Sequence, residues 1–131
     1  MATSPTVHII CSDQHRNGKT LLARVLVDFL MLDGRDPFCI DTDAPDGPLR
    51  AFFPGRTALA DFAAIKGQMK LFDTILAAPG RDYVIDLPAR HTESFFHTAR
   101  DLDFFAECKK TGFRVFVFFV VDNSFTSLKS A

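Results

Sequence analysis

The feature that most constrains this fold is the alternation of short apolar runs with longer stretches of helical periodicity. Residues 6–11, 37–41, 82–87 and 113–121 are apolar runs of the length and composition typical of buried strands. The stretch 19–32, with apolar side chains about four residues apart, is typical of a helix that buries one face. This alternation predicts an α/β domain with a mainly parallel sheet, right-handed crossovers and helices on both faces.

Two further helices are predicted between these strands. Thr57 is the expected N-cap of a helix of about twenty residues that ends before Pro79, and residues 49–55 are expected to be irregular. A third helix is predicted over residues 93–110, where Gly112 would stop it. No linker or internal repeat divides the 131 residues, so we expect one domain over 1–131.

Charge and cysteine content exclude several classes of protein. The 15 basic and 16 acidic residues give a net charge of −1, which does not support nucleic-acid binding. The 3 cysteines are widely spaced, which suggests neither a disulfide framework nor a zinc site. The chain also lacks an apolar run of membrane-spanning length and a terminal amphipathic stripe. We therefore expect a cytoplasmic protein without membrane contact.

The most informative motif lies between the first strand and the first helix. Residues 13–20 fit the phosphate-loop template at Gly18, Lys19 and Thr20, with Asp13 in the place of the first glycine. In such loops, backbone N–H groups at a helix N-terminus cradle phosphate, a lysine contacts the phosphates and a hydroxyl binds Mg²⁺. The segment therefore predicts a phosphate site, and the alternative is a helix that merely begins with polar residues.

Acidic residues follow the second and third predicted strands. Asp41 and Asp43 lie at the end of one strand and Asp86 at the end of the next. In a parallel sheet, ligands bind beyond the carboxyl ends of the strands, so these carboxylates are expected to converge on the loop after the first strand. They could there hold Mg²⁺ or orient a water molecule, whereas each aspartate taken alone could be a turn or helix-cap residue.

These motifs together resemble the ParA/MinD-type ATPases, the deviant Walker A branch of the phosphate-loop NTPases. The resemblance rests on residues 14–20, 41–45 and 86–88, which match the family's first motif, its D-x-D-P region and its D-x-P region in part. It implies a three-layer P-loop NTPase fold with the four predicted strands in the order 2-3-1-4. It also implies that the chain binds ATP and Mg²⁺.

The resemblance also assigns roles to individual residues. Lys19 would contact the phosphates, Thr20 would bind Mg²⁺, Asp86 would hold Mg²⁺ through water, and Asp43 would position the attacking water, which makes Asp43 and Lys19 the expected catalytic residues. The expected nucleotide-binding residues are Gln14, His15, Arg16, Asn17, Gly18, Lys19 and Thr20. The chain departs from the family where Gln14 replaces the signature lysine and His15 and Arg16 replace two glycines.

The resemblance predicts ATP binding with slow Mg²⁺-dependent hydrolysis, coupled to dimerisation in a partitioning or positioning switch. The altered loop favours an alternative, a degenerate P-loop domain that serves protein interaction without turnover. An ATP-dependent ligase or kinase of related fold is a third interpretation.

The last strand predicts association. Residues 113–121 are expected at the sheet edge, are apolar on both faces and carry only Arg114 as a charge, which is unusual for a protected edge. We therefore expect an incomplete functional unit, which is either the N-terminal half of a longer fold or is completed by a second copy. The expected state of the chain is a homodimer, formed by edge pairing or segment exchange. The phenylalanines of residues 93–110 are either a second partner surface or a wide buried stripe.

Overall fold

The computed structural model describes residues 4–12, 19–43 and 47–120, which form alternating strands and helices. In chain order, these elements are β1 (Thr6–Ser12), α1 (Lys19–Leu32), β2 (Pro37–Asp41), α2 (Pro48–Phe52), β3 (Thr57–Leu59), α3 (Ile65–Ala77), β4 (Asp82–Asp86), α4 (Ala89–Asp101), α5 (Phe104–Lys110) and β5 (Arg114–Val120).

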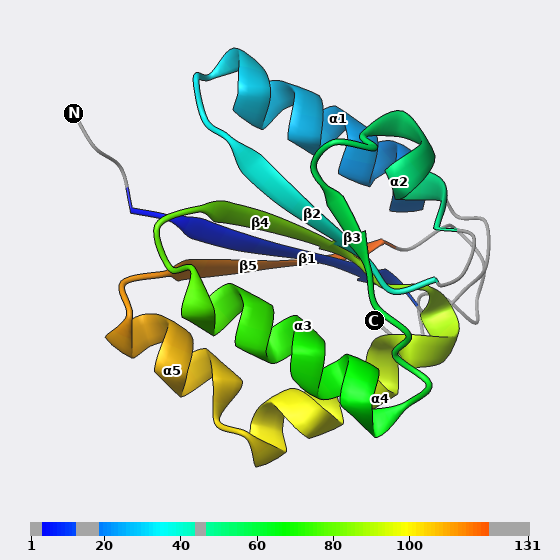
Figure 1. The fold of residues 1–131 in the computed structure, drawn as a ribbon, viewed down its shortest axis with the longest axis vertical. Helices are drawn as coiled ribbons and strands as arrows, with labels where there is room; N and C mark the ends of the chain where they lie inside the picture. Colours follow the sequence, from blue (N-terminus) through cyan, green and yellow to red (C-terminus); the bar gives the residue numbers. More distant parts are fainter. Residues whose placement is uncertain (1–3, 13–18, 44–46, 121–131) are drawn as a thin grey trace.

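The strands form one parallel sheet in the order β3-β2-β4-β1-β5. Helices α1 and α2 lie on one face of the sheet, and α3, α4 and α5 lie on the other (Figure 1). The expected α/β class and parallel sheet are confirmed. Both outer layers are required because a parallel sheet of this composition is apolar on both faces.

The expected strand order, 2-3-1-4, is incomplete because it lacks one strand of the sheet. The four strands expected from the sequence are β2, β4, β1 and β5 in space, but β3 adds a fifth strand beside β2. The second predicted strand is therefore internal rather than an edge. Because β3 pairs with β2 over only the three positions Thr57, Ala58 and Leu59, its run is too short to show a strand period in the sequence.

The prediction that Thr57 caps a long helix is wrong. Thr57 begins β3, and α3 starts eight residues later at Ile65. The Asp61 carboxylate accepts a hydrogen bond from the Ala63 backbone N–H at 3.1 Å, in the turn that leads into the helix. Gly67 allows α3 to approach this turn, since a Cβ there would lie 2.0 Å from the Asp61 carbonyl oxygen.

The single helix predicted over residues 93–110 is two helices. Asp103 adopts a left-handed conformation, with φ at 53°, and separates α4 from α5. The resulting change of direction lets Phe95 and Phe104 both point into the core, where they are 0% and 1% exposed, while Phe96 and Phe105 pack against its margin. The phenylalanines are thus mainly a buried stripe.

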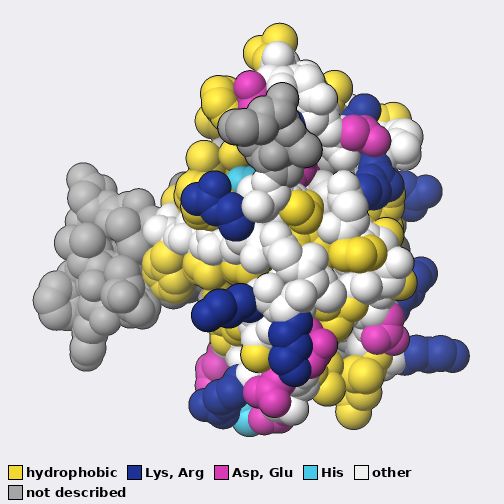
Figure 2. All heavy atoms as spheres, turned by 90° about the vertical axis from the view of Figure 1, so that its left-hand side faces the viewer, with side chains coloured by type: hydrophobic (Ala, Val, Ile, Leu, Met, Phe, Trp, Pro, Cys, Tyr) yellow, Lys and Arg dark blue, Asp and Glu magenta, His cyan; other side chains and the backbone are white. Residues whose placement is uncertain are grey.

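Each face of the sheet has its own apolar cluster. The cluster under α1 includes Ile10, Val27 and Val84, and the larger cluster under α3, α4 and α5 includes Phe72 and Phe95. Within the described residues, no helix is long and apolar enough to cross a membrane. On the face drawn in Figure 2, side chains of both charge signs are interspersed with hydrophobic ones.

An ion pair closes the amino end of the central strands. Arg35 contacts the Asp82 carboxylate through two nitrogens, at 2.6 and 2.7 Å, and Thr6 donates to the same carboxylate from its backbone N–H and its hydroxyl, both at 2.8 Å. Burial alone would raise the pKa of Asp82, but these hydrogen bonds outweigh it and lower the pKa. Asp82 is therefore a structural residue, at the opposite end of β4 from Asp86.

Candidate functional site

The candidate site lies where the carboxyl ends of β1, β2 and β4 meet. Local hydrogen bonds fix this edge: the Thr42 hydroxyl donates to the Asp86 carbonyl at 3.1 Å, and the Thr92 hydroxyl donates to the Ser12 carbonyl at 2.9 Å. The second bond ties the first turns of α4 to the end of β1. The strand ends are thus held rigidly, as positioned side chains in a binding site require.

Thr20 and Asp86 are brought together by the first turn of α1 and the end of β4. The Thr20 hydroxyl donates to one Asp86 carboxylate oxygen at 3.2 Å. The other carboxylate oxygen is buried and has no hydrogen-bond partner among the described residues. Buried carboxylate oxygens are normally satisfied, so this one is suited to a cation or an ordered water.

The electrostatics of Asp86 are set by burial. The residue is 3% exposed, and burial raises its pKa from an ordinary 3.8 to about 6, although the nearby Lys19 ammonium favours the charged form. The side chain is therefore ionised at neutral pH but at a free-energy cost. A cation bound beside it would remove that cost.

Asp41 has a different role from the one its position suggested. Its carboxylate accepts hydrogen bonds from the backbone N–H groups of Asp43, at 3.0 Å, and Leu49, at 2.9 Å. The second bond satisfies a donor in the first turn of α2. Gly47 is needed here because a Cβ would lie 2.7 Å from an Asp41 carboxylate oxygen. Asp41 thus holds Asp43 and Leu49 to the end of β2.

Asp43 forms an ion pair with Arg90, which sequence reasoning missed. One Arg90 guanidinium nitrogen contacts an Asp43 carboxylate oxygen, and both side chains are partly exposed. Arg90 lies in the first turn of α4, beyond the D-x-P segment, and the chain offers no signal that would link it to Asp43. This pairing joins the end of the segment after β2 to the first turn of α4, and Asp43 is close enough to Asp86 for their charges to interact.

The predicted loop residues Gln14, His15, Arg16, Asn17 and Gly18 lie outside the described residues, so the expected phosphate cradle is represented here only by Lys19 and Thr20. Within the described part of the chain, no group of three or more His, Cys, Asp or Glu side chains could hold a metal ion. Mg²⁺ in nucleotide sites commonly uses only one or two protein ligands, with phosphate and water completing its shell. Thr20 and Asp86 fit that requirement.

Compared with protein-family models and with curated proteins, the chain matches none of them.

Proposed function

We propose that this protein binds a nucleoside triphosphate, ATP by the resemblance described above, together with Mg²⁺, and hydrolyses it slowly as a dimerisation switch. The observation that supports this most is the contact between the Thr20 hydroxyl and the Asp86 carboxylate. It lies beyond the carboxyl ends of parallel strands and at the N-terminus of a 14-residue helix, where phosphate binding is favoured.

Each residue of the site has a defined task in this proposal. Lys19, in the first turn of α1, would neutralise phosphate oxygens. Thr20 and Asp86 would hold the metal ion, which when bound neutralises charge that develops on the phosphates. The Asp86 oxygen without a described partner is the atom that a hydrated cation would satisfy.

Calorimetric titration with ATP and ADP, each with and without Mg²⁺, tests the proposal. We expect saturable, Mg²⁺-enhanced binding that Lys19→Ala abolishes. Lys109→Ala, which removes an exposed lysine of α5, is the matched control and should bind like the wild type. If wild type and Lys19→Ala bind ATP equally well, the phosphate-site assignment is wrong.

The alternative, an interaction module without turnover, is favoured by the Asp43–Arg90 ion pair. A carboxylate held by a guanidinium is less available to orient an attacking water. If Asp43 does serve hydrolysis, Asp43→Asn should lower the turnover rate more than it weakens ATP binding, because a positioned water contributes mainly in the transition state. ATP binding without measurable phosphate release by the wild type would favour the interaction module instead.

Dimerisation would use the outer edge of β5, which pairs with no other strand among the described residues. The Arg114 N–H donates to the Pro5 carbonyl at 2.9 Å, so alternate residues of β5 face β1 and the backbone groups of Val115, Val117 and Phe119 face outward. The side chains of Val117 and Phe119 are 49% and 36% exposed. If β5 of a second copy lay antiparallel to this edge, with the twofold axis at Val117, each of these outward N–H groups would meet a carbonyl of the partner strand.

Sedimentation velocity across a tenfold concentration range tests this edge. We expect a concentration-dependent dimer that Val117→Lys converts to a monomer, since a charge on an edge strand opposes pairing. Val25→Lys, at a position on α1 that is 57% exposed, is the matched control and should leave the dimer intact. A wild type that stays monomeric throughout would refute pairing through β5.

A further inference from the structure

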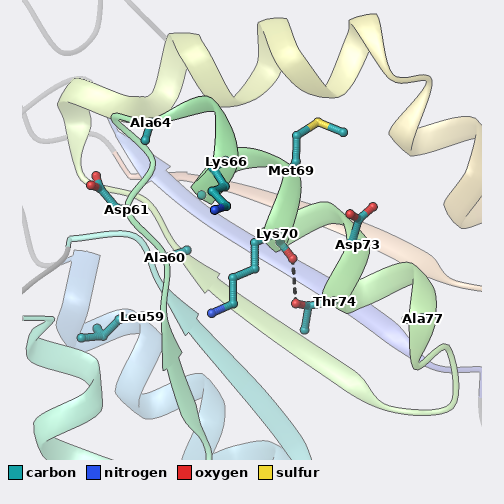
Figure 3. A pocket seen from close by; sticks show the side chains of 11 residues that line it. Leu59, Ala60, Asp61, Ala64, Lys66, Met69, Lys70, Asp73, Thr74 and Ala77 are labelled. Carbon is teal, nitrogen blue, oxygen red and sulfur yellow. Dashed lines mark hydrogen bonds between the residues drawn. The ribbon is translucent and has the colours of Figure 1, made fainter.

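A groove runs between the flank of α3 and the edge of β3 that pairs with no described strand. Its end at Asp61 lies beside Asp43, because these two residues form an isolated β-bridge. Its volume is about 880 Å³, and it follows α3 from the first turn of the helix to its end. Figure 3 shows the helix overhanging the strand. The lining residues from the strand side are Leu59, Ala60 and Asp61, and those from the helix side include Lys66, Gly67, Lys70, Thr74 and Ala77.

The backbone of β3 offers hydrogen-bonding groups to this groove. The Cys39 N–H donates to the Arg56 carbonyl at 2.8 Å, and the Ala60 N–H donates to the Asp41 carbonyl at 2.9 Å. These two bonds show that residues 56, 58 and 60 face β2, so the N–H and C=O of Leu59 point to the free edge. No described residue bonds to either of these groups. They can therefore pair with an added strand.

The charges that overhang the groove are positive. Lys66 and Lys70 lie one turn apart on the same side of α3, and Lys70 extends towards β3 (Figure 3). Neither ammonium group forms an ion pair with a described residue. Asp61 and Asp73 also line the groove, but the Asp61 carboxylate accepts the Ala63 N–H, and in Figure 3 the Asp73 carboxylate does not extend towards β3 as the Lys70 side chain does. An acidic ligand is thus favoured over a basic one.

The two sides of β3 differ in what they present. The Ala60 side chain belongs to the core under α3. The Leu59 side chain lies on the α2 side, next to Gly47, where an added Cβ would be only 2.3 Å from a Leu59 side-chain carbon. Side chains of a strand alternate between the two faces of a sheet. An added strand with alternating acidic and apolar residues would therefore turn its acidic side chains towards the lysines and its apolar ones towards Leu59.

We propose that this groove binds an acidic, extended peptide segment of a partner protein, which adds to β3 as a further strand. The 13 residues of α3 span about 20 Å at 1.5 Å per residue. An extended chain covers that length in about six residues. Backbone bonds at Leu59 would supply affinity, and Lys66 and Lys70 would select for acidic side chains. The proposal that this groove binds a peptide does not rest on the proposed nucleotide function.

Fluorescence anisotropy with a labelled hexapeptide of alternating glutamate and valine tests the proposal. We expect saturable binding with a Kd below about 1 mM, and binding about tenfold weaker for the double variant Lys66→Glu/Lys70→Glu. Both lysines are exposed, and glutamate suits the first turns of a helix, so this variant should fold. The control variant Lys109→Glu/Lys110→Glu makes the same charge change on α5 and should bind like the wild type.

Three further probes separate strand addition from simple charge attraction. A hexapeptide of alternating lysine and valine should not bind, and a glutamate–valine peptide with methylated backbone nitrogens should bind at least about tenfold more weakly. Amide chemical-shift changes should centre on Leu59 and Ala60. No binding of the acidic peptide, unchanged binding by Lys66→Glu/Lys70→Glu, or equal binding of a labelled oligothymidylate would each overturn the proposal.

Discussion

Replacing Asp86 with asparagine should stabilise the protein in the absence of ligands. The wild-type carboxylate is 3% exposed and has one oxygen without a described hydrogen-bond partner. Asparagine keeps an oxygen that can accept the Thr20 hydroxyl, but it carries no charge that burial would penalise. Asp86→Asn therefore removes the free-energy cost of ionising the buried carboxylate and keeps the hydrogen bond from the Thr20 hydroxyl.

The size of this effect follows from the pKa of Asp86. Folding raises that pKa from 3.8 to about 6. A raised carboxyl pKa means that the folded state holds the proton more tightly, so stability falls as pH rises from the unfolded value through the folded one. The accumulated cost is about 3 kcal/mol at pH 8 and about 1 kcal/mol at pH 4.5. The advantage of Asp86→Asn should therefore shrink by about 2 kcal/mol between these two pH values.

Urea unfolding of both proteins at several pH values measures this difference directly. Comparison at the same pH cancels the titration of all other groups, and the same substitution at an exposed position, Asp73→Asn, is the matched control. A free-energy difference between Asp86→Asn and wild type that does not change with pH would refute the reasoning. Mg²⁺ and ATP should raise the stability of the wild type more than that of Asp86→Asn, because only the carboxylate can compensate a cation.

Two further substitutions test the scaffold. Arg35→Ala should destabilise the protein by about 3 kcal/mol at pH 7, since it leaves the Asp82 carboxylate without its buried partner. The pKa of Asp82 is lowered on folding, so the ion pair stabilises the protein above the ordinary aspartate pKa, and this stabilisation is lost as pH falls through the folded pKa. Urea unfolding should therefore show a smaller effect of Arg35→Ala at pH 3 than at pH 7. Gly67→Ala should lower stability by at least about 2 kcal/mol in thermal unfolding, because its Cβ would lie 2.0 Å from the Asp61 carbonyl oxygen, whereas Gly55→Ala, with nothing within 4 Å, should change it little.

Sequence periodicity predicted the elements that are long or strongly buried. Strands β1 and β4 were found because burial on both faces leaves a continuous apolar run in the sequence. Strand β5 was found from the same kind of run, but the expectation that it is buried on both faces is wrong, since its side chains are exposed or only partly buried among the described residues. The edge strand β3 was missed because three residues cannot establish a period. The break at Asp103 was missed because no glycine or proline marks it, and its left-handed backbone is imposed by the packing of α4 and α5.

The candidate site was only partly predictable for the same reason. Asp86 and Thr20 each lie at the end of an element whose position in the sheet follows from topology, so their convergence could be expected. The pairing of Asp43 with Arg90, and the role of Asp41 in holding Leu49, depend on the path of the loop after β2. No spacing rule in the sequence connects these residues, because the contacts form only once the loop has its shape.

The two ends of β4 show how a structural aspartate and a candidate functional one differ within a single strand. Asp82 begins the strand, is held by Arg35 and Thr6, and has a lowered pKa. Asp86 ends the same strand, is more deeply buried, has one oxygen without a described partner, and has a raised pKa. Burial acts in the same direction on both, so the difference lies in whether the protein itself supplies the compensating donors. At Asp82 it does. At Asp86 the described residues leave the compensation incomplete, which is consistent with the proposed cation as the remaining partner of this carboxylate.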